Sequence, residues 1–399
     1  MKKAKVLACF DGFKGTLLAD KVAEAVTSKL VELYGQERLE TRILSLSDGG
    51  GGFLAALRKP MDLEMVPVLV TGPLGDDGGL ITAHYGRSEE ERFKDVAVVE
   101  MANASGLHLV TPKEKLNPLN TTTKGTGELI KAAYEAGHRH IIVGMGGSAT
   151  NDGGLGCLQA LGLRVAVATE AGETTYPSVI YGRDLTRVVS LEMPTDREEL
   201  LPGAVVEVAC DVNNPFCGEK GAVATFARQK GANTKEILDE LERGMCHIVP
   251  MLQRLPSCKT KDLAKLPGSG AAGGLAGGIV ASTGATIKKG IEFVSQLLGL
   301  EEAIQQSDII FTGEGSYDAQ TAHGKVVSQV QLLANKHNKR VIIICGRKDI
   351  PPELDDHVYD CVSLYSTEES MQRPYECIQG LVEAKHHLFF LMSDASSAS

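Results

Sequence analysis

The sequence lacks the excess of basic residues that is typical of proteins that coat nucleic acid. Its 399 residues include 41 lysines and arginines against 51 aspartates and glutamates, so the formal net charge is −10. A surface of this charge also disfavours broad contact with an anionic membrane. A small anionic metabolite can still be held by local lysines, arginines and backbone amides. We therefore expect small-molecule partners, and neither a nucleic-acid nor a membrane partner.

Patterns that would identify a disulfide framework or a metal-binding cluster are also missing. The nine cysteines are scattered, without a Cys-x-x-Cys pair or a cluster with histidines. In a chain of this length, such spacing is typical of reduced thiols in a reducing compartment. His138 and His140 would share one face of a strand, but no third metal ligand accompanies them. The sequence therefore does not favour a structural metal site.

No apolar run in the sequence is long enough to cross a membrane. The run that follows Met1 is too short for the core of a signal peptide. We therefore expect a cytoplasmic protein. The small, polar segment 393–399 has the composition of a disordered tail.

Glycine, in contrast, is present in excess, at 44 of 399 residues, against a usual share of ~7%. Many glycines follow apolar runs, where they let the backbone approach a ligand. Residues 6–10 predict a strand, residues 11–15 a turn, and residues 17–34 a helix that Thr16 caps. A second strand at 43–46 leads into another glycine-rich turn. This alternation indicates an α/β fold with mostly parallel strands.

The pattern changes in the middle of the chain. Segments 66–70, 80–85 and 96–101 predict strands that are joined by turns, with no helix between them. Alternation of strands and helices resumes near Lys288. We therefore expect one α/β domain built from both ends of the chain, with a second domain inserted between them.

Polar residues follow several of the predicted strands, and ligands of open α/β sheets collect at the carboxyl ends of strands. Lys14 lies in the first strand-to-helix turn, where a lysine beside helix-N-terminal amides suits a phosphate or a carboxylate. An ordinary exposed lysine is an equal alternative. Asp48 ends the second strand and can hold Mg²⁺ directly or through water. It is equally well placed to cap the next helix.

The loop after the strand near residue 141 carries several polar groups. It contains two hydroxyls, an amide and a carboxylate among glycines, in the residues Gly146, Gly147, Ser148, Thr150, Asn151 and Asp152. Backbone amides and hydroxyls can surround phosphate oxygens, and the carboxylate can orient a hydroxyl or a metal-bound water. The spacing of Gly144, Gly146 and Ala149 also fits a loose dinucleotide fingerprint, although no acidic residue ends a strand about twenty residues later. The spacing Gly146-x-Ser148-x-Thr150 narrowly misses a nucleophile elbow.

Two later strands end in similar groups. Asp211 follows one strand, and Lys230 comes after it. Glu314 follows the other strand, with Asp318 and Gln320 close behind. Carboxylates at so many strand ends exceed what turn chemistry requires, so together they indicate a cleft that binds metal and phosphate. No Gly-x-x-x-x-Gly-Lys-Ser/Thr P-loop is present, which predicts a nucleotide site of another kind.

These groups lie in ordered segments that span most of the chain. The segments are residues 11–15, 100–109, 117–129, 146–154, 210–231, 270–275 and 312–325. In them the sequence resembles the bacterial-type, or type 1, glycerate kinases. The resemblance implies an enzyme that uses ATP and Mg²⁺ to phosphorylate D-glycerate, usually to 2-phosphoglycerate.

The resemblance also implies two α/β domains, one of them Rossmann-like and discontinuous, with the active site in the cleft between them. Residues 1–66 and 288–392 would form the discontinuous Rossmann/flavodoxin-like domain, and residues 67–287 the inserted α/β domain. We expect a monomer or a homodimer.

On this interpretation, Lys14 is a catalytic residue that neutralises anionic groups of substrate or ATP, and Lys230 binds such groups. The base toward the glycerate hydroxyl would be Asp152 or Asp318, and the sequence does not choose between them. A carboxylate of ordinary pKa is sufficient, because the proton leaves late in phosphoryl transfer.

The other candidates would hold metal or phosphate. Asp48, Asp211 and Glu314 would hold Mg²⁺. Phosphate or the glycerate carboxylate would be bound by the glycine-rich loop and by a later amide, through Gly146, Gly147, Ser148, Thr150, Asn151 and Gln320.

The sequence departs from the family pattern at several places. Gly12 and Thr16 replace serines, and Phe53 replaces a threonine. Gly51 stands where a glutamate is usual, and Ser316 where an arginine is usual. Such losses would alter metal or anion contacts. Two alternatives therefore stay open: a catalytically silent metabolite- or nucleotide-binding homologue, and an NAD(P)-linked hydroxy-acid oxidoreductase suggested by the dinucleotide-like spacing.

Overall fold

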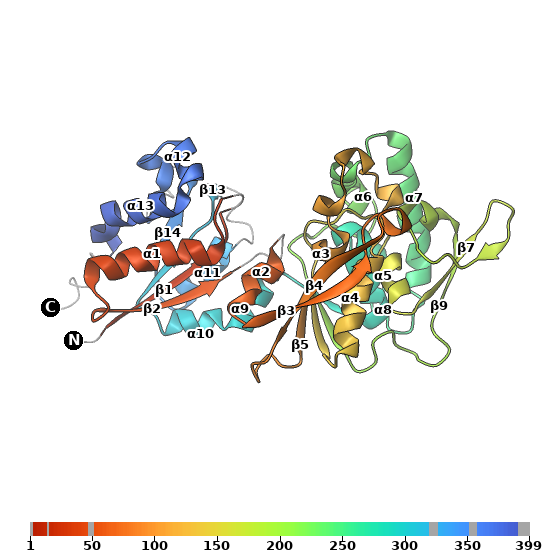
Figure 1. Ribbon diagram of the computed structural model, residues 1–399, viewed down its shortest axis with the longest axis horizontal. Helices are drawn as coiled ribbons and strands as arrows, with labels where there is room; N and C mark the ends of the chain where they lie inside the picture. Colours follow the sequence, from red (N-terminus) through yellow and green to blue (C-terminus); the bar gives the residue numbers. More distant parts are fainter. Residues whose placement is uncertain (1–2, 14–15, 47–51, 319–325, 351–356, 390–399) are drawn as a thin grey trace. The chain divides into compact units, whose positions relative to one another are not determined.

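The structure is a computed structural model that describes residues 3–13, 16–46, 52–318, 326–350 and 357–389 (Figure 1). The fold is α/β, as the sequence predicts, and most strand pairs of its two large sheets are parallel. Contacts between residues divide the chain into two compact units, Met1–Asp48 with Ile291–Ser399, and Gly49–Gly290. The predicted tail at 393–399 lies outside the described residues.

The first unit is built on a five-stranded parallel sheet with the order β16-β14-β12-β1-β2. Its strands are β1 (Ala4–Phe10), β2 (Leu39–Ser45), β12 (Ile309–Thr312), β14 (Arg340–Cys345) and β16 (Val358–Asp360). Its helices are α1 (Ala19–Tyr34), α9 (Gly290–Leu298), α10 (Leu300–Gln305), α11 (Val326–Lys336), α12 (Thr367–Gln372) and α13 (Pro374–Phe389).

Alternate residues of these strands face opposite sides of the sheet. Phe10 and Ile344 belong to the core that packs against α1 and α13, two helices that lie side by side (Figure 1). Ile343 and Cys345 instead pack with Val327 of α11. Because both faces are covered, the strands are apolar along their whole length, as is usual for buried parallel sheets.

The order of the chain reverses between β1 and β12. From β1 the chain continues to β2 on one side, whereas β12, β14 and β16 follow one another on the other side. In a parallel sheet, such a reversal leaves a crevice beyond the carboxyl ends of the two central strands. The loops after Phe10 and Thr312 are therefore placed to border a binding site.

Helix α1 begins later than the sequence predicts. Its N-cap is Leu18, which makes no side-chain capping bond. The sequence predicts that Thr16 caps this helix, but the Thr16 hydroxyl donates to the backbone carbonyl of Phe13 at 2.9 Å. The capping prediction is wrong because a tight turn before the helix already uses this hydroxyl.

The second unit is built on a six-stranded sheet with the order β11-β10-β6-β5-β4-β3. Its strands are β3 (Leu63–Thr71), β4 (Leu80–Ser88), β5 (Val96–Glu100), β6 (His140–Gly144), β10 (Val205–Ala209) and β11 (Thr286–Lys288). Strands β3, β4 and β5 pair antiparallel, and the pairs from β5 to β11 are parallel.

The helices of the second unit connect and cover these strands. They are α2 (Phe53–Arg58), α3 (Ala102–Ser105), α4 (Lys124–Glu135), α5 (Leu155–Ala160), α6 (Ala222–Phe226), α7 (Lys235–Leu252) and α8 (Leu275–Thr283). Within the described ranges of the whole chain, no helix has both the length and the apolar character that a bilayer crossing requires.

The division by contacts falls between Asp48 and Gly49, whereas the sequence places the domain boundary after residue 66. The difference arises because α2 contacts β3, β4 and β5. The Glu100 carboxylate at the end of β5 accepts hydrogen bonds from Gly52 N at 2.8 Å and from Leu54 N at 3.1 Å. The start of α2 is thereby tied to the second sheet, and the role of the two units as domains stays a prediction.

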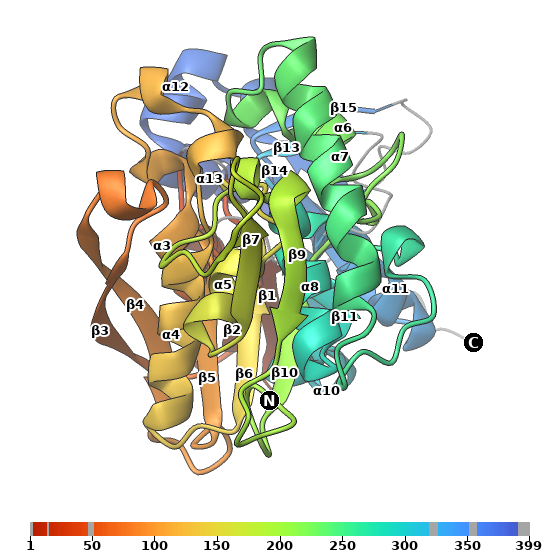
Figure 2. The same ribbon diagram turned by 90° about the vertical axis from the view of Figure 1, so that its right-hand side faces the viewer.

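Short strands that the sequence analysis did not predict form two further sheets. Strands β7 (Arg164–Ala168), β8 (Thr174–Thr175) and β9 (Val188–Glu192) make an antiparallel sheet in the second unit, and Figure 2 shows β7 and β9 side by side. In the first unit, β13 (Ser316–Asp318) pairs parallel with β15 (Arg347–Asp349). Strands β8, β13 and β15 have only two or three residues, too few for an alternating pattern to be recognised.

Gly313 allows the strand ends of the first unit to approach closely. A Cβ added there would lie 1.7 Å from Ile344 O and 3.1 Å from the Phe10 ring, and Gly313 O accepts a hydrogen bond from Asp11 N at 3.1 Å.

We expect Gly313→Ala to lower the free energy of unfolding by about 1–3 kcal/mol, because backbone must move to admit the methyl group. Urea denaturation measures this loss. Gly12→Ala is the matched control, because a Cβ there meets nothing closer than 3.5 Å, and equal losses in both variants would contradict the explanation.

Candidate functional site

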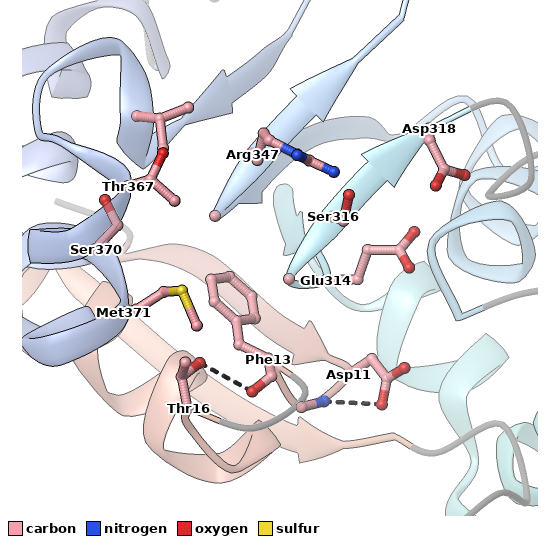
Figure 3. Close-up of a pocket in the computed structure, with 14 residues that line it drawn as sticks. Asp11, Phe13, Thr16, Glu314, Ser316, Asp318, Arg347, Thr367, Ser370 and Met371 are labelled. Atoms are coloured by element: carbon pink, nitrogen blue, oxygen red, sulfur yellow. Dashed lines mark hydrogen bonds between the residues drawn. The ribbon is translucent and has the colours of Figure 1, made fainter.

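The first unit contains a cavity of about 360 Å³ beyond the carboxyl ends of β1, β12 and β14 (Figure 3). Asp11 follows β1, Glu314 follows β12, and Arg347 comes after β14, at the start of β15. Asp318 enters the lining from β13. The reversal of chain order between β1 and β12 is thus accompanied by a cavity with charged walls.

Three carboxylates and one guanidinium supply the charges among the described lining residues. The carboxylates belong to Asp11, Glu314 and Asp318, and the guanidinium to Arg347. Arg347 is the register partner of Ser316, and the two lie next to each other in Figure 3. Glu314 is only 8% exposed, so solvent screens its charge weakly. Because the carboxylates outnumber the guanidinium, we expect an anionic ligand to bind this cavity only together with a cation.

The donor set of this cavity suits a hard metal ion, because carboxylate oxygens are the ligands that Mg²⁺ prefers. Glu314, a predicted magnesium ligand, lies here beside Asp11 and Asp318. Among the described residues, the one cluster of three ligand-type side chains with ligand atoms within 4.8 Å of one another lies elsewhere. An open arrangement is usual for Mg²⁺, which one or two carboxylates hold together with waters and substrate phosphates.

Asp11 and Arg347 were not predicted as site residues. Both follow buried strands, as does Glu314, so the same rule applied after residues 10 and 345 would have selected them. Thr367 and Met371 reach the cavity from α12. No local sequence signal identifies these two, because their position depends on how α12 packs.

In the second unit, the loop at residues 145–154 follows β6 and is anchored by neighbouring backbone. Ala149 N donates to Ser105 O at 2.9 Å, and Ser148 forms an isolated β-bridge with Gly106. Gly146 is half-buried and Gly147 is exposed. Their backbone is therefore the part of the loop nearest to solvent.

Helix α5 begins only at Leu155, after the loop has ended. Gly153 and Gly154 have φ values of 63° and 81°, which end the loop outside helical geometry. A dinucleotide fingerprint requires its third small residue to pack at the start of the helix. Ala149 lies well before that start, so the geometry does not favour the dinucleotide interpretation.

Asp152 is fully buried, and its carboxylate accepts four hydrogen bonds. Thr123 N and Oγ1 donate to Oδ2 at 2.7 Å each, Gly156 N donates to Oδ2 at 3.3 Å, and Gly154 N donates to Oδ1 at 3.1 Å. Burial raises the pKa of Asp152, and these bonds oppose the shift. The carboxylate ties the loop to the starts of α4 and α5. Its enclosure disfavours the predicted role as a base toward substrate.

Lys230 ends a short 3₁₀ helix, η6 (Arg228–Lys230), and is 1% exposed. Its Nζ donates to the backbone carbonyl of Thr150 at 2.7 Å. Burial lowers the pKa of Lys230 to about 7, and the charge of Asp152 opposes this shift. Lys230 therefore supports the loop from inside the core, whereas the sequence predicts that it meets an anion directly.

Thr150 and Asn151 are buried with unused hydrogen-bonding capacity. Thr150 Oγ1 and both polar atoms of the Asn151 side chain have no hydrogen-bond partner among the described residues. Buried polar atoms are nearly always paired, so atoms of this kind indicate a place for an ordered water or a polar ligand. Both residues are predicted to bind phosphate or glycerate, and this geometry is compatible with that prediction.

The structure places the predicted site residues in two groups. Glu314 and Asp318 share the cavity of the first unit. Ser148, Thr150, Asn151, Asp152 and Lys230 lie in or under the loop of the second unit. Asp211 also belongs to the second unit, where its Oδ1 accepts a hydrogen bond from Gly290 N at 2.8 Å. Lys14, Asp48 and Gln320 lie outside the described residues, and the predicted cleft stays a prediction.

The burial of Lys230 predicts a pH-dependent contribution to stability. Its usual pKa of 10.5 falls to about 7 in the folded chain, so between these values the unfolded chain binds more protons than the folded chain. The contribution of Lys230 to the free energy of unfolding therefore rises as the pH rises through this window.

Lys230→Met is expected to remove this rise. Urea denaturation of both proteins at several pH values measures the free energy of unfolding. We expect the wild-type value minus the variant value to grow as the pH rises toward 10.5. Lys220→Met is the matched control, because Lys220 is an exposed lysine of the same segment. A difference that stays constant across the window would contradict the prediction.

The chain is similar to known proteins along most of its length. The sequence matches the model of the glycerate kinase family over residues 6–390. A glycerate kinase of Bacillus subtilis strain 168 is 39% identical over 342 residues, which cover 86% of this chain and 85% of the relative. A glycerate 2-kinase of Escherichia coli strain K12 is 38% identical over 342 residues, with 86% of this chain and 85% of the relative covered.

The fold is also similar to that of a solved structure. A crystal structure of a Salmonella typhimurium LT2 protein described as a glycerate kinase 2 superposes with a TM-score of 0.77 and 35% identity. The superposition covers 97% of this chain and 100% of the other. Sequence and fold thus agree over nearly the whole length, and the chain belongs to the glycerate kinase family.

Proposed function

We propose that the protein is an ATP- and Mg²⁺-dependent kinase that transfers the γ-phosphate to a hydroxyl of D-glycerate and forms 2-phosphoglycerate. The observation that carries the proposal is the cavity beyond β1, β12 and β14, with its three carboxylates and one guanidinium. Membership of the glycerate kinase family supports glycerate as the acceptor. The relative from E. coli, a glycerate 2-kinase, supports transfer to the 2-hydroxyl.

The charges of the cavity support a nucleotide that is bound together with a metal ion. Carboxylates repel a triphosphate unless a cation lies between them. Mg²⁺, when bound, neutralises phosphate charge, and Asp11 and Glu314 would hold it directly or through water. Arg347 would bind phosphate oxygens with its planar fork of N–H donors.

Asp318 is the better placed of the two predicted bases. Phosphoryl transfer relies mainly on positioning and charge neutralisation, so the base has only to accept the hydroxyl proton late in the reaction. Asp318 lines the cavity, whereas the Asp152 carboxylate is enclosed by its four hydrogen-bond donors. We assign proton acceptance to Asp318 and orientation of the loop to Asp152.

The loop of the second unit supplies groups that suit glycerate. The unused polar atoms of Thr150 and Asn151 can pair with the hydroxyl and carboxylate oxygens of a small hydroxy acid. Lys230 lies beneath them with a pKa of about 7. An anion bound to the loop would favour the protonated form of this lysine.

The direct test is turnover by purified protein with ATP, Mg²⁺ and D-glycerate. We expect 2-phosphoglycerate, detected by coupling to enolase, which uses this isomer without a mutase. A chelator should abolish turnover, and added Mg²⁺ should restore it. A signal that requires phosphoglycerate mutase would move the transfer to the other hydroxyl. Binding of ATP and glycerate without product would instead identify a catalytically silent homologue.

Replacing the proposed base tests the assignment of Asp318. Asp318→Asn is expected to lower kcat by roughly 10²–10⁴-fold, the usual loss for a general base, and to leave the apparent affinity for Mg²⁺ unchanged. Asp349→Asn is the matched control, because Asp349 is the register partner of Asp318 on β15 and does not line the cavity. Steady-state kinetics of both variants would decide. Full activity in Asp318→Asn, or equal losses in both, would remove Asp318 from the mechanism.

A further inference from the structure

Two thiols and a carboxylate converge in the second unit, and none of these three residues is assigned to the kinase reaction. One ligand atom each of Cys217, Glu242 and Cys246 lies within 4.8 Å of the other two. Glu242 and Cys246 are four residues apart on α7, so they share one face of that helix. Cys217 comes from the segment between β10 and α6. We call these three residues the Cys217 cluster.

The surrounding structure holds the three side chains in place. Phe216 has no exposed surface, and its backbone N–H donates to Ala264 O at 3.1 Å, which anchors the residue before Cys217. Gly218 N donates a short hydrogen bond to Glu242 Oε1, and Cys246 Sγ lies 3.6 Å from the same oxygen. These contacts hold the Glu242 carboxylate on α7 against the segment that carries Cys217.

The Cys217 cluster has unused binding capacity. Glu242 Oε2 is buried and has no hydrogen-bond partner among the described residues. A buried carboxylate oxygen without a partner is costly unless a cation or water satisfies it. The negative charges of Glu242 and Asp262 both raise the pKa of Cys217. The same negative charge favours a cation at this position.

Both thiols have a raised pKa. Burial, with contributions from Cys217 and Glu242, raises the pKa of Cys246 to about 12. Burial also raises the pKa of Cys217. All nine cysteines of the chain are free of disulfides, so both sulfurs remain available as ligands.

We propose that Cys217, Glu242 and Cys246 bind a thiophilic divalent cation of the Zn²⁺ type. Thiolate sulfur selects zinc and similar metals, whereas Mg²⁺ prefers a set of oxygens, so this site differs in chemistry from the magnesium site proposed for the kinase reaction. The two thiols release their protons to solvent as the metal binds. Three protein ligands leave one tetrahedral position open.

Zinc uptake by the full chain tests the site directly. Protein reduced with a phosphine is mixed with Zn²⁺, passed through a desalting column and analysed for metal. We expect one zinc per chain in the wild type and its loss in the Cys217→Ser/Cys246→Ser double variant. Glu242→Gln should weaken binding by roughly tenfold or more. Cys258→Ser is the matched control, because Cys258 is a half-buried cysteine outside the cluster.

A second measurement separates loss of the site from loss of folding. Zn²⁺ should raise the thermal unfolding temperature of the wild type and of Cys258→Ser, and should raise it less in Glu242→Gln, whose side chain has nearly the same size. The proposal is wrong if the reduced wild type takes up no zinc, or if the double variant retains it. If the reduced protein binds no zinc and the protein as isolated contains a Cys217–Cys246 disulfide, the two cysteines form a redox pair and the zinc proposal is wrong.

Discussion

Parallel strands bring their carboxyl ends to the same edge of a sheet, and in each unit the candidate site residues depend on this constraint. In the first unit it collects the residues after β1, β12 and β14, which are far apart in the sequence, around one cavity. In the second unit β6 and β10 also run parallel, and the loop at 145–154 and Asp211 follow these strands. Loops therefore carry the chemical groups, and the strands determine where those groups lie.

Buried charges give the loop of the second unit its shape. Removing a charge from water costs several kcal/mol unless partners replace the lost hydration. The Asp152 carboxylate has four hydrogen-bond donors, and Lys230 Nζ donates to the Thr150 carbonyl. These bonds act on the backbone on both sides of Asn151. They thereby hold Thr150 and Asn151 with their side-chain polar atoms unpaired, as a polar ligand requires.

Much of the fold could be predicted because long elements leave a periodic apolar pattern. The strand predicted at residues 6–10 is observed as β1 (Ala4–Phe10), and the helix predicted at 17–34 is observed as α1 (Ala19–Tyr34). Strands β7, β9, β13 and β15 were not predicted. Of these, β13 and β15 have only three residues each, and their pairing with each other is not revealed by local sequence. Of the candidate site, Glu314 and Asp318 followed from their place after a strand, whereas Arg347 was overlooked although it obeys the same rule.

The sequence by itself determined the α/β class and the family, because local strand and helix patterns indicate the class and ordered local motifs indicate the family. It could not decide which carboxylate meets solvent, since Asp152 and Asp318 both follow strands and differ only in how the chain packs around them. Nor could it reveal the Cys217 cluster, which has no spacing motif. Only the packing of α7 beside the segment after β10 brings two sulfurs and a carboxylate within reach of one ion. Proximity between residues distant in the sequence is a property of tertiary structure alone.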